Sequence, residues 1–487
     1  MQSLWEATCN MPSFDPLPGD IRTDALVIGA GMAGILTAYL LQSWGRKTVL
    51  LEANRVCGGV TKGTTAKVTS QHNLIYAKLM ETIGLRAARQ YTDANERAVE
   101  GYRSLIRANG IDCEWEEQSA YLYSVKDAAL LQKEAAAAKK LGIAAQVTDR
   151  IGGLPFAVKA GEALRFENQA QFHPLKFAAA LLKDLTVYEQ TRVTELKDQE
   201  AVTDRGSVFA KDIVFATHYP FVNVPGFYFA RLHQERSYVL ALRDAPKVEG
   251  MALGIDSPSY SFRNSGDYLL LGGAGHRTGE NQAGGRYEEL RRQAKAWYPD
   301  AKEAYYWSAQ DGITPDAVPY IGRYSSSRPH WYVAAGFQKW GMTSSMVAAR
   351  TIAEMITGKA NDGAGVFSPQ RLHVAASAKV LAEDTGKAVS NLAKEIFKAP
   401  PQALLDVLPG KSGIVDYEGE KVGVYRNEEG DCFYVTTRCP HLGCQLAFNP
   451  DERTWECPCH GSRFDYRGKL LDGPAQTDIT LVFAEEA

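Results

Sequence analysis

Histidine and cysteine are scarce in this chain, which holds 9 of the first and 8 of the second among 487 residues. Neither sign of charge is in excess, because 54 Lys and Arg stand against 57 Asp and Glu. A chain with such evenly balanced charges has no basic stripe of the kind that phosphate backbones select. We therefore expect no nucleic-acid partner. The chain also lacks an apolar run of roughly 18 residues and a basic, apolar N-terminal signal. We therefore expect a soluble, cytoplasmic protein with no membrane span.

The few cysteines are distributed unevenly. Cys9, Cys57 and Cys113 are scattered through the first quarter, whereas the other five gather between positions 432 and 459. A secreted disulfide scaffold spreads its cysteines over a much shorter chain, so this cluster indicates a local site. The length itself is ample for two or three well-packed domains.

A glycine motif stands near the start of the chain. The apolar run 25–28 reads as a buried parallel strand, and a stretch of helical length after the glycines ends near Trp44. A second β-rich run, 47–51, closes on Glu52. This order is that of a Rossmann βαβ unit, in which glycines let the backbone approach a pyrophosphate and the acid binds ribose hydroxyls. The glycines of the motif are Gly29, Gly31 and Gly34.

Later features favour FAD over NAD as the nucleotide. The loop 55–72 is rich in glycine and hydroxyl side chains and is suited to wrapping a second phosphate and the edge of a flavin. Another apolar strand ends at 216–217, and in 331–358 a strand and a turn lead into a long helix that starts near Thr343. The N-terminus of that helix could stabilise negative charge on a reduced flavin. No second GxGxxG follows a strand, so we do not expect electrons to come from NAD(P)H.

These motifs resemble the D-amino-acid-oxidase and sarcosine-oxidase superfamily of FAD amine oxidoreductases over roughly residues 22–360. The resemblance lies in GAGMAG with Glu52, the loop KGTTAKVTSQH, the strand end ATH, the segment DGITPDAVPYIG and the turn GFQKWGMTSS. It implies a Rossmann-type FAD-binding domain interleaved with an antiparallel-sheet substrate domain. The predicted FAD-binding residues are Gly29, Gly31, Gly34, Glu52, Thr64, Thr65, Ala66, Val193, Ala216, Thr217, Gly336, Gly341, Met342 and Thr343.

The candidate catalytic residues follow from the same resemblance. His72 comes after the FAD loop, in a region where some relatives attach flavin to a histidine, although the local spacing here differs and favours a supporting histidine. The stretch 259–279 matches the substrate-facing sheet of family members and contributes Tyr260, Arg263 and His276. Arg263 could bind a substrate carboxylate through two parallel hydrogen bonds, or serve as a structural arginine.

The cysteine cluster near the C-terminus carries a metal-ligand pattern. Cys439-x-His441 is followed, after fifteen residues, by Cys457-x-x-His460. Two thiolates and two imidazoles could hold tetrahedral zinc. A Rieske [2Fe-2S] centre uses two cysteines on one iron and two histidines on the other. Because each loop here supplies one ligand of each kind, the spacing favours the Rieske centre over a zinc finger.

The loops CPHLGC and CPCHGS closely resemble the cluster-binding loops of Rieske proteins. In high-potential members, a disulfide joins the positions of Cys444 and Cys459, so the resemblance implies that bond here. Ser462 matches a serine that donates to a cluster sulfur, whereas Phe464 stands where those members often have tyrosine. The resemblance therefore implies an intermediate potential within the Rieske range of about −150 to +300 mV.

The expected fold class is α/β plus β, in three parts. Residues 1–375 form the FAD-dependent oxidoreductase domain, 376–402 a helical linker ended by two prolines, and 403–487 a small all-β Rieske domain. The cofactors are FAD and a [2Fe-2S] cluster.

The expected reaction is oxidation of an amine or amino acid to an imine, with electrons passing from FAD to the cluster and on to an unknown external acceptor. Two alternatives stay open: a reductase component for a separate oxygenase, and an oxygen-reducing amine oxidase with an accessory cluster. A Rieske oxygenase with mononuclear iron needs two histidines and a carboxylate, usually with paired histidines on one helix. The seven other histidines are dispersed, which disfavours it.

Overall fold

The computed structural model describes residues 2–159, 161–361, 363–371, 404–417 and 419–482. Contacts divide them into two compact units. The first takes the described residues of 1–220, 237–274 and 288–377, and the second those of 221–236, 275–287 and 378–487. The predicted linker 376–402 lies outside the described residues. Two segments of the predicted oxidoreductase domain, 221–236 and 275–287, thus group with the C-terminal part.

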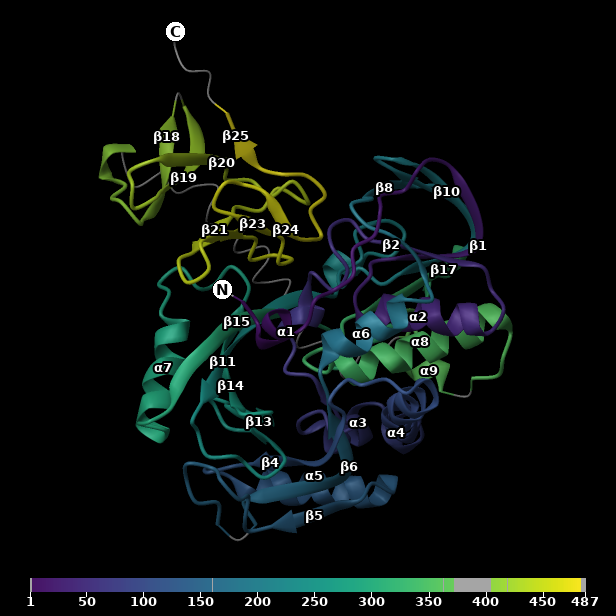
Figure 1. The fold of residues 1–487 in the computed structure, drawn as a ribbon, viewed down its shortest axis with the longest axis vertical. Helices are drawn as coiled ribbons and strands as arrows, with labels where there is room; N and C mark the ends of the chain where they lie inside the picture. The colour runs from purple at the N-terminus through teal and green to yellow at the C-terminus, as the bar shows by residue number, and fades with distance from the viewer. Residues whose placement is uncertain (1, 160, 362, 372–403, 418, 483–487) are drawn as a thin grey trace. The chain divides into compact units, whose positions relative to one another are not determined.

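The first unit contains a largely parallel sheet (Figure 1). Its strands in spatial order are β16 (Tyr320–Ser325), β17 (Arg328–Ala335), β10 (Gly206–Phe215), β1 (Ile21–Ile28), β2 (Thr48–Leu51) and β7 (Thr186–Tyr188), with β9 (Glu200–Thr203) and β8 (Val193–Leu196) attached beyond β10. β17, β10, β1, β2 and β7 run parallel. The second half of β1 and all of β2 are buried, as their apolar sequences predict.

Two helices pack together in this unit beside the parallel sheet. α2 (Met32–Ser43) contacts β1 and β2, and α8 (Gly341–Thr357) contacts α2 along its length (Figure 1). Both helices are largely buried. The remaining helices with their described bounds are α1 (Leu4–Thr8), α3 (Ile75–Thr82), α4 (Gly84–Asn109), α5 (Ala128–Leu141), α6 (Pro174–Leu182), α7 (Arg286–Trp297) and α9 (Ala364–Phe367).

A second, mainly antiparallel sheet is interleaved in sequence with the first. In spatial order it holds β15 (Lys302–Ile313), β11 (His233–Arg243), β14 (Tyr268–Arg277), β13 (Ser261–Ser265), β12 (Met251–Gly254), β4 (Glu116–Tyr123), β6 (Ala163–Gln171) and β3 (Lys67–Val68), and β5 (Ala145–Thr148) pairs with β6. β12 and β4 pair in parallel. This arrangement confirms the predicted Rossmann-type domain with an interleaved antiparallel sheet.

The C-terminal part is all-β. One sheet holds β18 (Ser412–Tyr417), β19 (Glu420–Arg426), β20 (Cys432–Thr436) and β25 (Thr480–Leu481), and the other holds β21 (Ala447–Asn449), β22 (Thr454–Glu456), β23 (Arg463–Asp465) and β24 (Leu470–Asp472). Trp455 and Phe464 pack with four cysteines in its core. The predicted small all-β domain is thus confirmed.

Buried polar contacts tie the segments 221–236 and 275–287 to this β part within the second unit. The Arg236 guanidinium donates to both carboxylate oxygens of Glu452, at 2.7 and 2.5 Å, and their side chains are only 2% and 1% exposed. Asn281 Nδ2 donates to Asp451 at 2.8 Å, and the amide of Gly279 donates to Glu456 at 3.0 Å. Two segments far away in sequence therefore complete this unit.

In the part of the chain that the structure describes, every helix is too short or too polar to cross a bilayer.

We predict that Gly34→Ala destabilises the first unit. A Cβ at position 34 would lie 1.9 Å from the carbonyl oxygen of Gly29, so α2 would have to move away from β1. Overpacking of this kind costs about 1–3 kcal/mol. The thermal midpoint of the protein measures the loss, and Gly365→Ala is the control, because no atom lies within 4 Å of a Cβ there. Equal midpoints for the two variants would contradict the close packing.

Candidate functional site

The predicted nucleotide site lies at the carboxyl edge of the parallel sheet. The amide of Gly29, after β1, donates to Leu51 at the end of β2, and the amide of Ala216, after β10, donates to Ile28 at the end of β1, both at 2.8 Å. Glu52 follows Leu51 directly, so β1, β2 and β10 bring Gly29, Glu52 and Ala216 to one edge. This is the edge at which open α/β sheets bind ligands.

The first two glycines of the motif occupy their positions for different physical reasons. Gly29 has a φ of +100°, and a Cβ there would lie 2.6 Å from the carbonyl oxygen of Ala216, so both conformation and space require glycine. Gly31 has an ordinary φ of −80°, and a Cβ would meet only the Thr61 hydroxyl, at 3.4 Å. Nothing in the described protein requires a glycine at 31. The open space before α2 fits a pyrophosphate that approaches the helix N-terminus.

Glu52 is held by main-chain donors. Its two carboxylate oxygens accept from the amides of Ala30 and Asn54, each at 2.9 Å, and its burial raises the pKa of the carboxyl. Each oxygen retains a further lone pair for a ribose hydroxyl. The predicted ribose role of Glu52 therefore fits its position.

The predicted FAD loop is fixed through its carbonyl groups. Trp307 Nε1 donates to the carbonyl of Gly63 at 2.8 Å, and Trp5 Nε1 donates to that of Thr64 at 2.7 Å. Arg263 Nη1 donates to the carbonyls of Thr65 and Ala66. Three buried side chains thus set the course of this loop.

A threonine pair joins the same loop region to α8. The Thr343 hydroxyl donates to the carbonyl of Thr69 at 2.8 Å and accepts from the amide of Thr69 at 3.0 Å. Gly341 and Met342 precede Thr343 in the first turn of α8, which has no side-chain cap. Gly336 follows β17, Val193 begins β8, and the Thr217 hydroxyl donates to the carbonyl of Tyr219. For all fourteen residues, FAD contact stays a prediction.

Arg263 has a different environment from the one expected of a substrate-binding arginine. Its side chain is 2% exposed, its Nη1 donates to the FAD loop, and its Nε donates to the carbonyl of Asn264 at 3.0 Å. Its guanidinium also lies over the ring of Trp5, and burial lowers its pKa to about 9. With these donors directed at main-chain carbonyls, the geometry favours an anchoring role for Arg263.

His72 is buried with both ring nitrogens engaged. Its Nε2 lies 2.8 Å from the carbonyl of Thr69 and its Nδ1 lies 2.6 Å from the hydroxyl of Tyr91. The carbonyl can only accept, so Nε2 carries the proton and Nδ1 accepts from the tyrosine. Burial lowers the pKa of His72 to about 3, and its ring stacks on Trp340. This geometry fits the expected supporting histidine better than a flavin-linked one.

The other two catalytic candidates belong to different compact units. The ring of Tyr260, in the first unit, packs edge-on against Trp297 at 5.0 Å. His276 belongs to the second unit, where its Nδ1 donates to the carbonyl of Arg277 at 2.7 Å. The four candidates therefore have different neighbours, and their catalytic roles stay predictions.

Lys67 is a further ionisable residue beside the FAD loop. Its Nζ donates only weakly to the carbonyl of Ala252, at 3.4 Å. Burial, reinforced by the charge of Arg263, lowers the pKa of Lys67 to about 7. A lysine within a β-rich run gives no sequence signal of burial, which is why the sequence did not single it out.

The two cysteine loops of the second unit have the same backbone turn. In the first, the amide of Cys439 donates to the carbonyl of Cys444 and the amide of Gly443 donates to that of Cys439, at 2.8 and 2.9 Å. In the second, the amide of Cys457 donates to the carbonyl of Ser462 and the amide of Gly461 donates to that of Cys457, also at 2.8 and 2.9 Å. Gly443 and Gly461 have φ values of +78° and +79°, which explains a glycine four residues after each cysteine.

The four predicted cluster ligands present a matching donor set. The Nδ1 atoms of His441 and His460 are buried without a hydrogen-bond partner among the described residues, and the two rings lie 4.8 Å apart. The Cys457 thiol donates to the sulfur of Cys439, which lowers the pKa of Cys439 and raises that of Cys457. Two unpartnered nitrogens and two adjacent thiols fit a group with two imidazole and two thiolate ligands.

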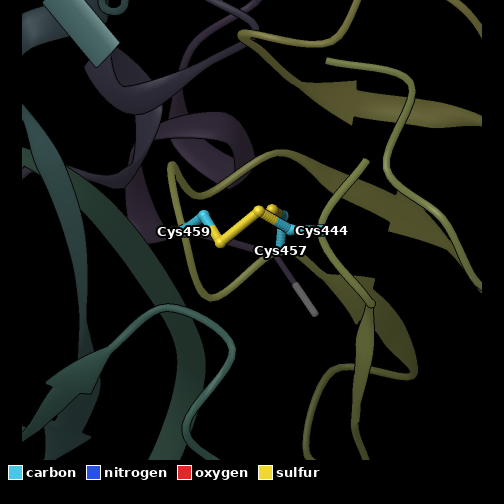
Figure 2. Close-up of side chains that lie close together, drawn as sticks. All are labelled: Cys444, Cys457 and Cys459. Carbon is cyan, nitrogen blue, oxygen red and sulfur yellow. A yellow bond between two sulfur atoms is a disulfide. The ribbon is translucent and has the colours of Figure 1, made fainter. Parts of the chain in front are cut away.

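A disulfide joins the two loops, as the Rieske resemblance implied. It links Cys444 and Cys459, and Figure 2 shows Cys457 beside it. The three sulfur atoms lie within 4.8 Å of one another, but two are spent in the disulfide, so Cys457 alone of these three retains a thiol for a metal. The Ser462 hydroxyl accepts from the amide of Ala475 at 3.0 Å and bonds to Cys439, so its own proton points toward the ligand sulfur.

Comparison with known families settles the class of both parts. Residues 24–355 match the model of the DAO family, described as FAD dependent oxidoreductase. The chain belongs to this family. Residues 400–482 match the Rieske [2Fe-2S] domain, which decides against a zinc finger. The protein is therefore an oxidoreductase with an FAD-binding part and a Rieske iron-sulfur part.

Similar proteins share this organisation or the fold of the first part. The Bacillus subtilis (strain 168) protein YhfW, named as a Rieske 2Fe-2S iron-sulfur protein, is 38% identical over 97% of this chain and 96% of its own. Glycine oxidase from Geobacillus kaustophilus superposes with a TM-score of 0.60 at 18% identity, covering 72% of this chain and 99% of that one. L-proline dehydrogenase from P. horikoshii gives 0.61 at 16% identity, covering 73% and 98%. At these identities the two structures show the fold alone.

Three residues that contact the ligand loops or their domain escaped sequence reasoning. Asn223 Oδ1 lies 2.8 Å from His441 Nε2, Gln234 Nε2 donates to the carbonyl of His460 at 2.6 Å, and Arg236 pairs with Glu452. No motif surrounds them, and their partners lie more than 200 positions away, so no local signal could have found them.

We predict that Gly31→Leu removes FAD while the fold persists. The added side chain would enter the space before α2, which the protein itself leaves open, and should exclude the pyrophosphate, so that little FAD stays bound. Bound flavin per chain measures the loss, with circular dichroism as the check on folding. Gly365→Leu, at an exposed glycine with open space around it, is the matched control. A fully flavinylated Gly31→Leu variant would refute this nucleotide site.

We predict that Lys67 makes the stability of the first unit depend on pH. Its pKa is lowered to about 7 in the folded chain, so between about pH 7 and 10 the unfolded chain binds more protons. Stability therefore rises with pH in this window, and Lys67→Met should remove that rise. The thermal midpoint of flavin release, compared with wild type from pH 7 to 9.5, measures it.

The control for this comparison is Lys302→Met, whose side chain is 79% exposed in the wild type. Its midpoint should follow that of wild type across the same pH range. Parallel curves for Lys67→Met and wild type would show that Lys67 titrates normally.

Proposed function

We propose that the protein oxidises an amine or amino acid at a C–N bond, and that the electrons leave through the Rieske part to an external acceptor. The observation that carries this proposal is the presence, in one chain, of a nucleotide-binding sheet edge and a Rieske-type donor set. Membership of the FAD dependent oxidoreductase family supports it. The fold shared with an oxidase of glycine and a dehydrogenase of L-proline supports an amino acid or related amine as substrate.

In this proposal bound FAD supplies the two-electron oxidation, and the chain supplies its position and environment. The open space at Gly31 and the carboxylate of Glu52 hold the nucleotide, while Arg263 keeps the loop 63–66 in place through its carbonyl groups. The uncapped first turn of α8 offers amides to negative charge. Because Arg263 is committed to the loop, we assign it no contact with substrate.

The Rieske part gives the chain a one-electron carrier in addition to a two-electron site. Both ligand loops are stiffened by main-chain bonds and by the disulfide, so little rearrangement is needed when an electron arrives. This pairing supports a protein or quinone-like acceptor that takes electrons singly, rather than oxygen alone.

An anaerobic titration of the purified protein with N-methylated amines and amino acids tests the proposal. Flavin absorbance and the electron-spin signal of the cluster are followed together. We expect a substrate to bleach the flavin and the cluster signal then to grow. If no compound bleaches the flavin, the assignment of an amine substrate fails. The hypothesis to test next is then that the protein is the reductase component of a separate oxygenase.

We predict that His441→Ala separates the two half-reactions. Flavin reduction by substrate should be nearly unchanged, whereas turnover with a one-electron acceptor should fall roughly a hundredfold, because the cluster loses a ligand. The matched control is His330→Ala, at a half-exposed histidine of the first unit. Undiminished acceptor turnover in His441→Ala would exclude the cluster from the electron path.

A further inference from the structure

The segment 221–236 lies against both imidazole ligands of the second unit. Asn223 Oδ1 is 2.8 Å from Nε2 of His441. Phe229 packs edge-on against the ring of His460, with centroids 6.2 Å apart, and Gln234 donates to the carbonyl of the same histidine at 2.6 Å. The segment therefore contacts both histidines: His441 at Nε2, and His460 at its ring and at its carbonyl.

The contact with Asn223 fixes the proton of His441. Nδ1 of His441 is buried and has no partner among the described residues, so it is the nitrogen available to iron. A neutral imidazole that binds metal through Nδ1 must carry its proton on Nε2. Only the amide oxygen of Asn223 can accept that proton, and the amide nitrogen in its place would demand the opposite tautomer. The observed orientation of Asn223 is thus the one that metal binding requires.

The position of Asn223 is itself held by buried contacts further along the segment. The ion pair of Arg236 with Glu452 is almost fully buried, and Arg463 donates to the same carboxylate at 2.6 Å. A Cβ on Gly461 would lie 2.7 Å from the Cβ of Gln234, so the segment and the second ligand loop approach as closely as a glycine allows. These contacts hold the C-terminal end of the segment against the second ligand loop.

We propose that Asn223 is a positioning residue for the [2Fe-2S] cluster. Its amide oxygen holds the Nε2–H of His441, so that Nδ1 faces the iron, and it lowers the reduction potential of the cluster. A residue 218 positions before the ligand, within the part that matches the FAD family, then helps to set how readily the cluster accepts an electron. The inference rests on the Rieske cluster of the proposed function and is independent of its amine substrate.

The sign of the effect follows from charge. Reduction adds one electron to the iron pair, and no bond to the protein is made or broken. The oxidised iron withdraws more electron density from the imidazole, so Nε2–H is a stronger donor in the oxidised state. A hydrogen bond to Asn223 therefore stabilises the oxidised state more than the reduced one. Removing the acceptor should make the cluster easier to reduce.

Redox titration of the full-length protein tests the proposal. Wild type, Asn223→Leu and Asn223→Asp are titrated with dithionite and mediators at one pH, and the electron-spin signal of the reduced cluster is followed. A net hydrogen bond is worth roughly a fivefold change in an equilibrium constant. Only the difference in bond strength between the two oxidation states enters the potential, so for Asn223→Leu we expect the reduction constant to rise by up to that factor, or up to about 40 mV, since tenfold is 59 mV for one electron.

Asn223→Asp should change the potential in the opposite direction, because a carboxylate is a stronger acceptor and adds negative charge. This reversal of sign separates positioning from a general loosening of the segment. The control is Val224→Ala, at the neighbouring residue, whose side chain is 63% exposed, and its potential should equal that of wild type. Iron content is measured for each variant to verify that the cluster is present.

Equal potentials for wild type, Asn223→Leu and Asn223→Asp at full iron content would overturn the proposal, as would shifts of the same sign in both variants. If Asn223→Leu fails to assemble a cluster, Asn223→Asp decides, because a lower potential supports the proposal and an unchanged one refutes it. The reductant is chemical, so a failure of the amine assignment would leave this result intact.

Discussion

The second unit is organised around the buried ion pair of Arg236 with Glu452, a carboxylate that Arg463 also contacts. Both side chains are removed from water, and the guanidinium meets the carboxylate through two hydrogen bonds. A buried charge without its partner is expensive, which makes any separation of the two residues unfavourable. Such a pair gives specificity more than net stability, because it fixes which surfaces meet. The contacts of Gln234 and Asn223 with the histidine loops follow from that fixed approach.

The iron-sulfur loops themselves rest on a repeated local device. Each begins with a cysteine and turns at a left-handed glycine four residues later, and the disulfide then joins the two turns. The repetition explains how a small β domain with a limited core orients two thiols and two imidazoles. Serine and main-chain donors complete the surroundings, so the geometry depends little on the flexible side chains of the surface.

Local patterns in the sequence predicted the parts of the structure that local physics determines. The strand, glycine and acid order at 25–52 became β1, α2, β2 and Glu52, and the Rieske loops have the donor set that their spacing indicated. Arg263 could not be resolved in the same way, because whether an arginine faces substrate or main chain depends on its partners in the folded state. The grouping of 221–236 and 275–287 with the C-terminal part had no sequence signal, since its contacts join distant positions.

The order of synthesis gives the buried ion pair a further consequence. Arg236 precedes Glu452 by 216 residues, so at about 5–20 residues per second the arginine leaves the ribosome roughly 10–40 s before its partner. During that interval Arg236 lacks the carboxylate of Glu452, and its guanidinium stays hydrated until that partner is made. The iron-sulfur part can therefore fold only late in the synthesis of each chain. It needs the C-terminal segment to pack against residues 221–236, which were synthesised much earlier.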